Sequence, residues 1–233
     1  MSFGDPELPE LSLIYARFAA LTSISADLGG RLLLYAGLDP EGMAAAMASN
    51  VAGAASLGIE RDASRAKQAL RSAVCDFVVN NLSEALRILK NEIRNHRAVS
   101  VVVTGEIEAI VSEMIARGVQ PDILTFPVQQ FIERGARVLA KDGQDGLIPV
   151  KWEAGSEPLR WLPVLDEMAI ASLKTADVRV RWVRAAPRYL GRKFADKRYV
   201  RMTQAEMERF TSEIRRGMTT EDIPVEVFVT HGD

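Results

Sequence analysis

Short apolar segments alternate with helical segments from residue 31 to residue 126, and this alternation constrains the fold more than any other feature. The segment Val99 to Val103 is the clearest predicted strand, because it is almost entirely β-branched. Strands joined by helices of about a dozen residues require crossover connections and so lie parallel in one sheet. The pattern predicts an α/β domain with a doubly wound, mainly parallel sheet. The predicted strands are 31–35, 55–59, 76–79, 99–103 and 121–126.

The helix limits follow from capping residues and from the spacing of apolar side chains. An amphipathic helix is expected from Leu8 to about Leu28, ahead of the first strand. Pro40 suits the first turn of the next helix, and Asp62 and Ser83 are candidate N-caps of two others. Gly118 is a typical C-terminal break for the helix that begins at Ile107. Each predicted strand is therefore followed by a bounded helix or a turn.

The regular pattern degrades after about Gly143. The segment Gly143 to Pro158 is rich in glycine and proline and is predicted to be a loop, whereas Leu159 to Leu173 is predicted to be helical. A capped amphipathic helix is expected from Met202 to Gly217, starting near Thr203. We therefore expect one domain over residues 1–143. Residues 144–233 are expected to form a mostly helical appendage packed on it, and whether that appendage folds independently stays open.

Composition excludes several classes of function. The 233 residues include 29 basic and 31 acidic side chains, for a net charge of −2, so no global field favours nucleic acid or an anionic membrane. Cys75 is the single cysteine, so neither an internal disulfide nor a multi-cysteine metal site is expected. The sequence has no stretch of bilayer-spanning length and no signal-like start, and a cytoplasmic protein is expected.

A glycine-containing turn follows the first predicted strand, with the sequence Gly37-Leu38-Asp39-Pro40-Glu41-Gly42. Dinucleotide-binding folds place a glycine-rich turn here, so that backbone N–H groups and a helix N-terminus meet the pyrophosphate. They also place an acidic residue about 20 positions later, at the end of the second strand, for the ribose hydroxyls. Glu60 occupies that position.

The amino-acid sequence around these positions indicates a particular family more specifically than the spacing of the positions does. Leu28-Gly29-Gly30-Arg31-Leu32, Ala36-Gly37-Leu38 and Ile59 to Arg65 resemble the start of the dinucleotide-binding domain of urocanase (urocanate hydratase), which has a T-A-G-L-G-G-M-G turn and a V-D-P-S-R-I segment. Asn81 to Leu86 is similar to the D-L-D-E-A-L of that family, and Arg117 to Thr125 to its R-R-G-V-R-P-D-L-V-T. The resemblance covers about residues 28 to 125 and implies a Rossmann-like fold.

The resemblance also implies a cofactor and a set of contacts. Urocanases add water to urocanate, with a tightly bound NAD acting as an electrophile. Carried over to this sequence, the family's cofactor contacts imply three sets of positions. Residues of the first turn lie against the pyrophosphate, an acidic residue holds the ribose, and two positions lie near later strand ends. The residues of the first turn are Gly37, Leu38 and Gly42. The acidic residue is Glu60, and the two positions near later strand ends are Gly105 and Thr125.

Departures from the family pattern put NAD binding in doubt. Asp39, Pro40 and Glu41 replace G-G-M of the family's turn and bring two carboxylates to the place where phosphates approach. The G-N of the family reads Gly105-Glu106, and its D-Q-T-S after the fifth strand reads Phe126-Pro127-Val128-Gln129. Nothing matches the family's flanking domains or its cysteine motif. No catalytic residue can be assigned, and no metal is expected.

Several individual side chains have a structural interpretation as well as a functional one. Arg61 is an ordinary surface arginine or, less favoured, a ligand of a 2′-phosphate. His96 is read as a residue that complements a helix end, and Cys75 as structural. Asp39 and Glu41 could act as an acid/base or metal-binding pair, but a helix N-terminus favours acidic side chains for dipole reasons alone, and this second interpretation is preferred.

The appendage carries a cluster of basic residues interleaved with aromatic ones. Such a cluster is able to grip phosphates, stack on bases or form an arginine-rich interface, and the balanced total charge favours an interface or a small anion over nucleic acid. The cluster comprises Arg179, Arg181, Arg184, Arg188, Arg192, Lys193, Lys197, Arg198 and Arg201 with Trp182, Tyr189, Phe194 and Tyr199.

Three hypotheses follow. The first is a urocanase-like domain that serves as a nucleotide- or anion-binding or regulatory module, with a degenerate NAD site and no hydratase activity by itself. The second is a hydro-lyase of the urocanate hydratase type, completed by a partner chain. The third is an interaction module that uses the arginine and aromatic segment 179–201. A homo-oligomer or a partner subunit is expected, and a membrane is not.

Overall fold

The computed structural model describes residues 8–140, 146–174 and 177–232, apart from the side chain of Lys193. The chain divides into two compact units, Met1–Asp142 and Gly143–Asp233. We call them unit 1 and unit 2 and describe each by itself.

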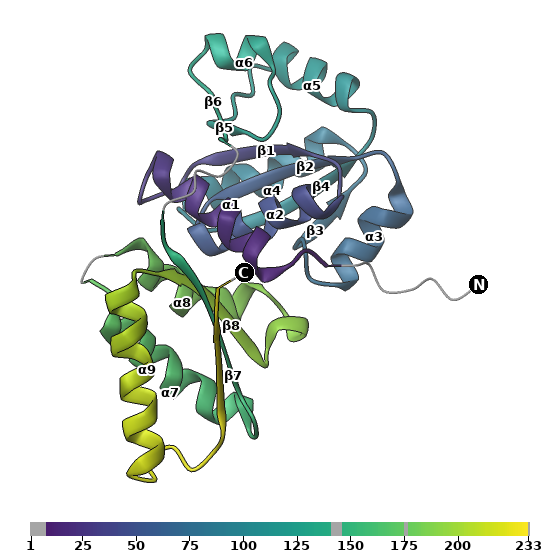
Figure 1. Cartoon of the computed structure of the whole chain (residues 1–233). Helices are drawn as coiled ribbons and strands as arrows, with labels where there is room; N and C mark the ends of the chain where they lie inside the picture. The colour runs from purple at the N-terminus through teal and green to yellow at the C-terminus, as the bar shows by residue number, and fades with distance from the viewer. Residues whose placement is uncertain (1–7, 141–145, 175–176, 233) are drawn as a thin grey trace. The chain divides into compact units, whose positions relative to one another are not determined.

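Unit 1 is built on a six-stranded sheet in which every pairing is parallel (Figure 1). The strand order is β3-β4-β2-β1-β5-β6, so the first strand lies inside the sheet, between β2 and β5. This arrangement confirms the predicted Rossmann-like, doubly wound sheet. The strands are β1 (Leu32–Ala36), β2 (Ala55–Glu60), β3 (Phe77–Val79), β4 (Val99–Thr104), β5 (Ile123–Leu124) and β6 (Arg137–Val138).

Helices connect successive strands of unit 1 and cover both faces of the sheet. The helix α2 packs on β1, β2 and β4, and α1 packs on α2 in turn. On the opposite face, α4, α5 and α6 enclose a core with the strands. The helices are α1 (Leu11–Ile24), α2 (Pro40–Ala52), α3 (Ala63–Arg71), α4 (Leu82–Arg94), α5 (Ile107–Ala116) and α6 (Gln129–Glu133).

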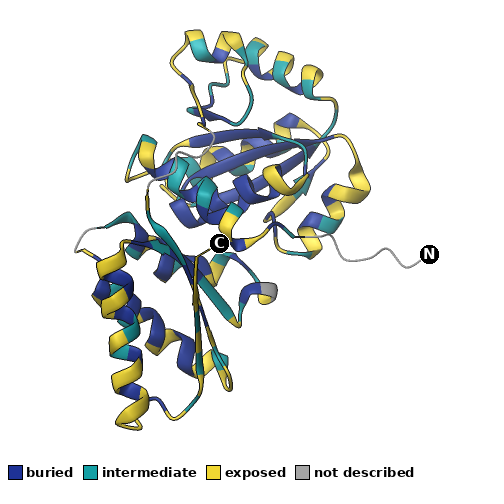
Figure 2. Ribbon diagram, viewed as in Figure 1, coloured by how far each residue is buried: buried dark blue, intermediate teal, exposed yellow. Residues whose placement is uncertain are grey.

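The central strands are buried on both faces, as expected of a parallel sheet covered by helices (Figure 2). Leu32 and Leu34 of β1 face the core formed with α4 and α5, together with Leu57 of β2 and Val101 of β4. Successive residues of a strand point to opposite faces, so Leu33 and the other alternate residues face α2.

The structure bears out one of the two predicted side-chain caps in unit 1 and corrects the other. Asp62 caps α3, because its Oδ1 accepts the N–H of Ser64 at 2.8 Å. The prediction that Ser83 caps α4 is wrong. Asn81 is the N-cap and accepts the N–H of Glu84 at 3.0 Å, which starts the helix early enough to bury Leu82 in its first turn.

Two strands at one side of the sheet differ from their prediction. β5 comprises Ile123–Leu124 within the predicted 121–126, and the sixth strand, Arg137–Val138, was not predicted. β6 is two residues long and both are exposed, so it carries neither an apolar run nor an alternating pattern.

Unit 2 is a three-stranded antiparallel sheet with the order β8-β7-β9 and three long helices. The predicted helices are confirmed, but the predicted loop is wrong over Ile148–Ala154, which forms β7; residues 143–145 lie outside the described part. Val150 and Trp152 of β7 are buried, and Lys151 and Glu153 between them are exposed. The elements are β7, α7 (Pro158–Ser172), α8 (Val178–Tyr189), η1 (Arg192–Phe194), β8 (Lys197–Met202), α9 (Gln204–Thr219) and β9 (Val227–His231).

Buried Trp152 anchors the core of unit 2. Its ring meets Phe210 edge to face at 5.2 Å between centroids, and its indole N–H donates to Asp166 Oδ1 at 3.1 Å. The other oxygen of Asp166 accepts a hydrogen bond from Arg198 Nε at 3.0 Å. Burial raises the pKa of Asp166, although Arg198 and Trp152 oppose the shift. The carboxylate thus joins β7, β8 and α7.

A second buried network fixes the start of α8 and of α9. Arg179 binds both carboxylate oxygens of Glu206 at 2.8 Å, and its Nε donates to Asp177 at 2.9 Å. Thr203 and Glu206 form a reciprocal capping box at the start of α9. Burial alone would raise the pKa of Glu206, but hydrogen bonds from Arg179 and Thr203 lower it to about 2.

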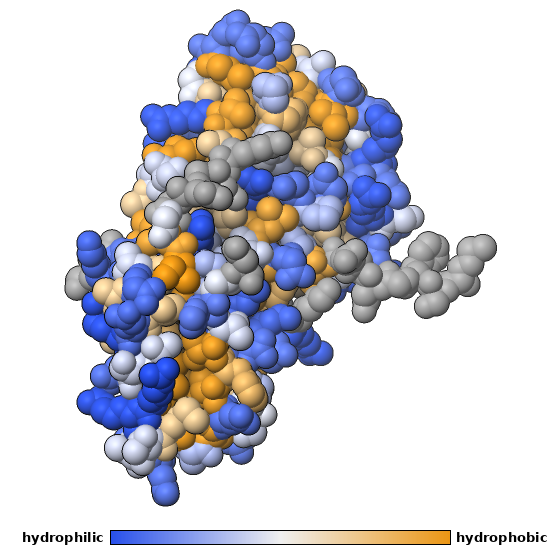
Figure 3. Space-filling view, in the orientation of Figure 1, coloured by the Kyte–Doolittle hydropathy of each residue, from blue (hydrophilic) through white to orange (hydrophobic). Residues whose placement is uncertain are grey.

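The outward face of α9 is hydrophilic, as Figure 3 shows over this helix. Its large apolar side chains that are buried are Met207, Phe210 and Ile214, at the spacing of an amphipathic helix. Over residues 8–140, 146–174 and 177–232, no helix is long and apolar enough to cross a membrane.

We predict that Gly58→Ala destabilises unit 1 by about 1–3 kcal/mol, because the added methyl meets a ring held in the core. A Cβ at Gly58 falls 2.4 Å from Tyr35 Cζ. The measurement is chemical denaturation followed by far-ultraviolet circular dichroism. Gly105→Ala is the matched control, since its Cβ meets only Ile110, at 3.4 Å. Equal stability of the two variants would contradict the packing argument.

We also predict that unit 2 loses stability as the pH falls from about 4.5, the ordinary pKa of Glu206, to about 2, its folded value. The lowered pKa stabilises the folded state above this window and ceases to do so below it. Glu206→Gln removes this dependence and costs about 3 kcal/mol at neutral pH.

Tryptophan fluorescence measures this transition, because all three tryptophans, Trp152, Trp161 and Trp182, belong to unit 2. The control is Glu208→Gln, an exposed neighbour on α9. An unchanged acid dependence in Glu206→Gln would show that other groups control it.

Candidate functional site

The candidate site lies where the strand order reverses, between the carboxyl ends of β1 and β5. β1 pairs with β2 on one side and with β5 on the other, so the connections leave in opposite directions from this point. Open α/β sheets bind ligands in the crevice at such a switch point. The turn from β1 into α2 forms one wall of the crevice, and Thr125, directly after β5, lies on the other.

Two glycines shape the turn between β1 and α2. Gly37 has a φ of +77°, in the left-handed region that favours glycine, and its N–H donates to the Ile59 carbonyl at 2.8 Å. A Cβ at Gly42 would lie 2.1 Å from the Gly37 carbonyl oxygen. The first turn of α2 therefore approaches the end of β1 so closely that only glycine fits at this position.

Glu60 is buried, with 5% of its surface exposed, and is bonded to the turn. Its Oε2 accepts the N–H of Leu38 and its Oε1 accepts the N–H of Asp62, both at 2.8 Å. The carboxylate thus connects the end of β2 to the turns before α2 and α3. Holding a ribose stays a prediction for this residue, and the hydrogen bonds give it a positioning role within the protein.

Asp39 is the N-cap of α2 and occupies another donor of the same turn. Its Oδ1 accepts the N–H of Gly42 at 2.8 Å, and its carbonyl accepts the N–H of Met43 at 2.9 Å. Pro40 has no N–H to offer. The turn donors on Gly37, Leu38, Gly42 and Met43 therefore all have acceptors within the protein.

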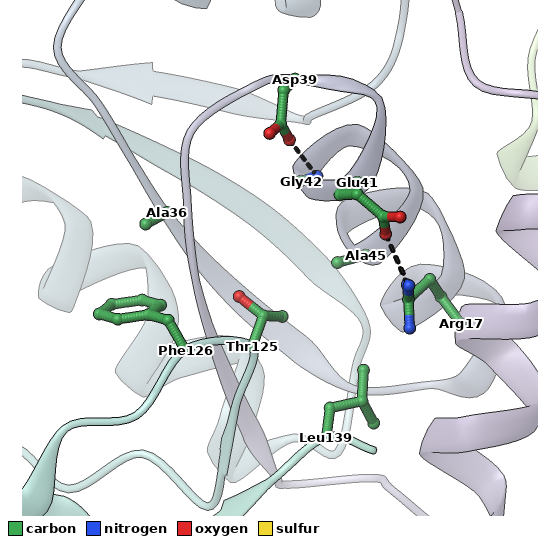
Figure 4. A pocket seen from close by; sticks show the side chains of 9 residues that line it. All are labelled: Arg17, Ala36, Asp39, Glu41, Gly42, Ala45, Thr125, Phe126 and Leu139. Atoms are coloured by element: carbon green, nitrogen blue, oxygen red, sulfur yellow. Dashed lines mark hydrogen bonds and ion pairs between the residues drawn. The ribbon is translucent and has the colours of Figure 1, made fainter. Parts of the chain in front are cut away.

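The crevice contains a pocket of about 220 Å³ (Figure 4). At its edge, Arg17 of α1 binds Glu41 of α2, with Nη2 and Nε at 2.7 and 2.8 Å from the same oxygen. Figure 4 also shows the Thr125 hydroxyl and the Asp39 carboxylate on opposite sides of the open space. The lining residues are Arg17, Ala36, Asp39, Glu41, Gly42, Ala45, Thr125, Phe126 and Leu139.

The residues of this turn do not fit a pyrophosphate. A phosphate at this helix N-terminus requires free backbone donors and a favourable dipole. The donors on Leu38 and Gly42 are taken by carboxylates, and Asp39 and Glu41 add negative charge at the same helix end.

The predicted site residues are brought together in two groups. Gly37, Leu38 and Glu60 meet through the hydrogen bonds at the end of β2, and Gly42 and Thr125 line the pocket. Gly105 is outside the pocket lining, and its N–H donates to the Glu60 carbonyl at 3.0 Å. All six assignments to a cofactor stay predictions.

Sequence reasoning missed Arg17, Phe126 and Leu139 as parts of this crevice. Arg17 carried a usable signal, because it is the sole charged residue within α1. Arg61, considered for a 2′-phosphate, pairs instead with Glu106 at 2.7 Å on the surface.

The cysteine and histidine of unit 1, Cys75 and His96, are not at this crevice. Cys75 is 4% exposed, and burial raises the pKa of its thiol to about 12, far from the thiolate form. His96 packs against Gly29 and Gly30, which precede β1 at the opposite end of the sheet. Within the described part of the chain, no three His, Cys, Asp or Glu side chains group in a way that could hold a metal ion.

Five of the thirteen residues in the cluster of basic and aromatic side chains have a structural role. Arg179 and Arg198 are in the buried networks of unit 2, and Trp182 is buried with its N–H on the Tyr199 carbonyl. Phe194 and Tyr199 are buried as well. The aromatic side chains that suggested base stacking are therefore mostly core residues.

We predict that Glu60→Gln destabilises unit 1 by about 1–3 kcal/mol, because an amide has one acceptor oxygen for two N–H donors that bind different carboxylate oxygens, one of them in a buried hydrogen bond. Denaturant unfolding followed by far-ultraviolet circular dichroism measures the effect. The control is Glu106→Gln, because its side chain is 55% exposed, its partner Arg61 is 72% exposed, and an ion pair between exposed side chains contributes little. A Glu60→Gln variant as stable as this control would refute the bracing role.

Comparison with protein families agrees with this geometry. Residues 14–128 match the family model described as the urocanase Rossmann-like domain. The match confirms the resemblance, which sequence motifs placed at about residues 28–125, and extends it back into α1 and forward beyond β5. Domains of this family are associated with NAD in general. Residues 14–128 of this chain are therefore similar to the Rossmann-like domain of urocanase.

Proposed function

We propose that unit 1 is a urocanase-like regulatory or binding module with a degenerate NAD site and no hydratase activity by itself. The observation that carries the proposal is the occupation of the turn: carboxylate oxygens of Glu60 and Asp39 accept the N–H groups of Leu38 and Gly42. A pyrophosphate would have to displace both carboxylates, and one of them is buried.

Electrostatics supports the same proposal. The positive end of the α2 dipole, which would attract a phosphate, already faces Asp39 and Glu41. Arg17 lines the pocket, but its guanidinium is already bound to Glu41. A phosphate entering the pocket would therefore meet carboxylates and one cation that is already paired.

The hydratase alternative requires groups that would have to come from elsewhere. Cys75 is a buried thiol with a raised pKa, and His96 is at the far end of the sheet from the crevice. His231 belongs to unit 2. Unit 1 by itself thus offers no cysteine or histidine for the reaction at the switch point, and a partner chain would have to complete it.

The experiment is native purification followed by denaturation and mass spectrometry of the released small molecules. We predict no NAD at stoichiometric level and no thermal stabilisation by added NAD. Restoring the turn of the family with Asp39→Gly, Pro40→Gly and Glu41→Met is expected to produce a measurable thermal shift with NAD, because it removes the carboxylates of Asp39 and Glu41 and frees the N–H of Gly42.

Near-stoichiometric NAD in the native protein would contradict the proposal and would favour the lyase alternative. Urocanate turnover would then be assayed with and without candidate partner chains.

A further inference from the structure

Polar side chains lie inside the core of unit 1, on the face of the sheet that α2 covers. Three hydroxyl oxygens and one amide oxygen there have no hydrogen-bond partner within the described part of the chain. A buried polar atom without a partner is costly, and most such atoms in folded proteins have one. We call this group the buried polar cluster; it consists of Tyr35, Ser56 and Ser100, each 0% exposed, and Asn50, which is 6% exposed.

The sheet register brings the two serines together. Ser56 of β2 and Ser100 of β4 are direct Cα partners in neighbouring parallel strands, so their side chains stand side by side. Leu57 and Val101, the next residues along these strands, belong to the core on the α4 face. Because successive residues of a strand point to opposite faces, both serines face α2.

Tyr35 reaches from β1 across β2 toward the same place. Its Cα partner is Gly58, and a Cβ at Gly58 would lie 2.4 Å from Tyr35 Cζ and 2.5 Å from its hydroxyl oxygen. The ring therefore lies over Gly58, two residues along β2 from Ser56 and on the same face.

The Tyr35 hydroxyl stays protonated and is a neighbour of the Ser100 hydroxyl. Burial raises the pKa of Tyr35, and the nearby Ser100 hydroxyl partly opposes this rise. The two groups nevertheless do not meet in hydrogen-bond geometry. Each hydroxyl therefore keeps one proton to donate and lone pairs to accept with.

Asn50 closes the cluster from the helix side. Its Nδ2 donates to Asp76 Oδ2 at 3.3 Å, and the same carboxylate oxygen accepts the N–H of Ser100 at 2.7 Å. This bonding holds the amide near Ser100, with its Oδ1 unpaired. An amide oxygen only accepts, so the cluster needs a donor there.

These groups fit a small neutral ligand that both donates and accepts. Water has two protons and two lone pairs, so one molecule can donate to Asn50 and to one hydroxyl while it accepts from the other two. A cation would need an available negative charge, but the carboxylate of Asp76 already accepts two hydrogen bonds. We infer that the buried polar cluster is an internal water site that joins α2 to β1, β2 and β4.

This inference is independent of the proposed function, because the cluster includes no residue of the turn between β1 and α2 or of the pocket lining. The first measurement is a crystal structure of the full chain at a resolution that shows ordered water. We expect a density peak about 2.7–3.2 Å from at least three of the four oxygens. Direct pairing of the Tyr35 and Ser100 hydroxyls, with no water between them, would overturn the inference.

The second measurement is the thermal unfolding of Tyr35→Phe, a variant that removes one oxygen and keeps the ring. A bridging water makes this change destabilising, because the water loses a partner while the other groups stay buried, and the midpoint should fall by about 3–5 °C. An oxygen that has no partner at all gives the opposite sign, since its removal relieves an unsatisfied group.

Far-ultraviolet circular dichroism follows the unfolding, and tryptophan fluorescence identifies the transition of unit 2, which holds all three tryptophans. The control is Ser64→Ala, which removes an exposed hydroxyl from α3 of the same unit and should shift the midpoint by less than about 1 °C. A Tyr35→Phe midpoint equal to or above that of the unmodified chain would overturn the inference, whatever the control shows.

Discussion

A buried carboxylate holds the carboxyl edge of the parallel sheet together. Glu60 ends β2 and accepts N–H groups from the turn before α2 and from the turn before α3. Its own carbonyl accepts the N–H of Gly105 beyond β4, so the turns that precede α2, α3 and α5 meet at one residue. In a dinucleotide-binding sheet this position faces a ribose. Here the side chain is used within the protein, and the shape of the crevice depends on it.

Carboxylates of the protein also lie at other positions of the turn where a phosphate would bind. Asp39 caps α2 in the place where a phosphate would receive the N–H of Gly42, and Glu41 is paired with Arg17 across the mouth of the pocket. Carboxylates at a helix N-terminus stabilise the helix by the interaction that would otherwise attract an anion. The fold that the family model matches is retained, and on our proposal side chains of the chain itself occupy the turn that would bind a cofactor.

Much of unit 1 could be predicted from sequence, because buried parallel strands are short apolar runs and helix limits are set by caps such as Asp62. Asn81 was missed in favour of Ser83 because both are good caps two residues apart. β7 was missed because Pro149 and Gly155 obscure the alternation that buries Val150 and Trp152. The partners of Glu60 and Arg17 could not be foreseen, since they join residues 22 and 24 positions apart through tertiary packing.

The central claim is that the phosphate donors of the turn are already occupied, and amide NMR tests it most directly. Isotope-labelled protein is titrated with inorganic pyrophosphate while the Leu38 and Gly42 amide signals are followed. The account predicts no displacement of either signal up to millimolar pyrophosphate, together with slow hydrogen exchange at Leu38, whose N–H is bonded to a buried carboxylate. Saturable displacement of both signals at micromolar pyrophosphate would show that the turn still binds phosphate and would contradict the account.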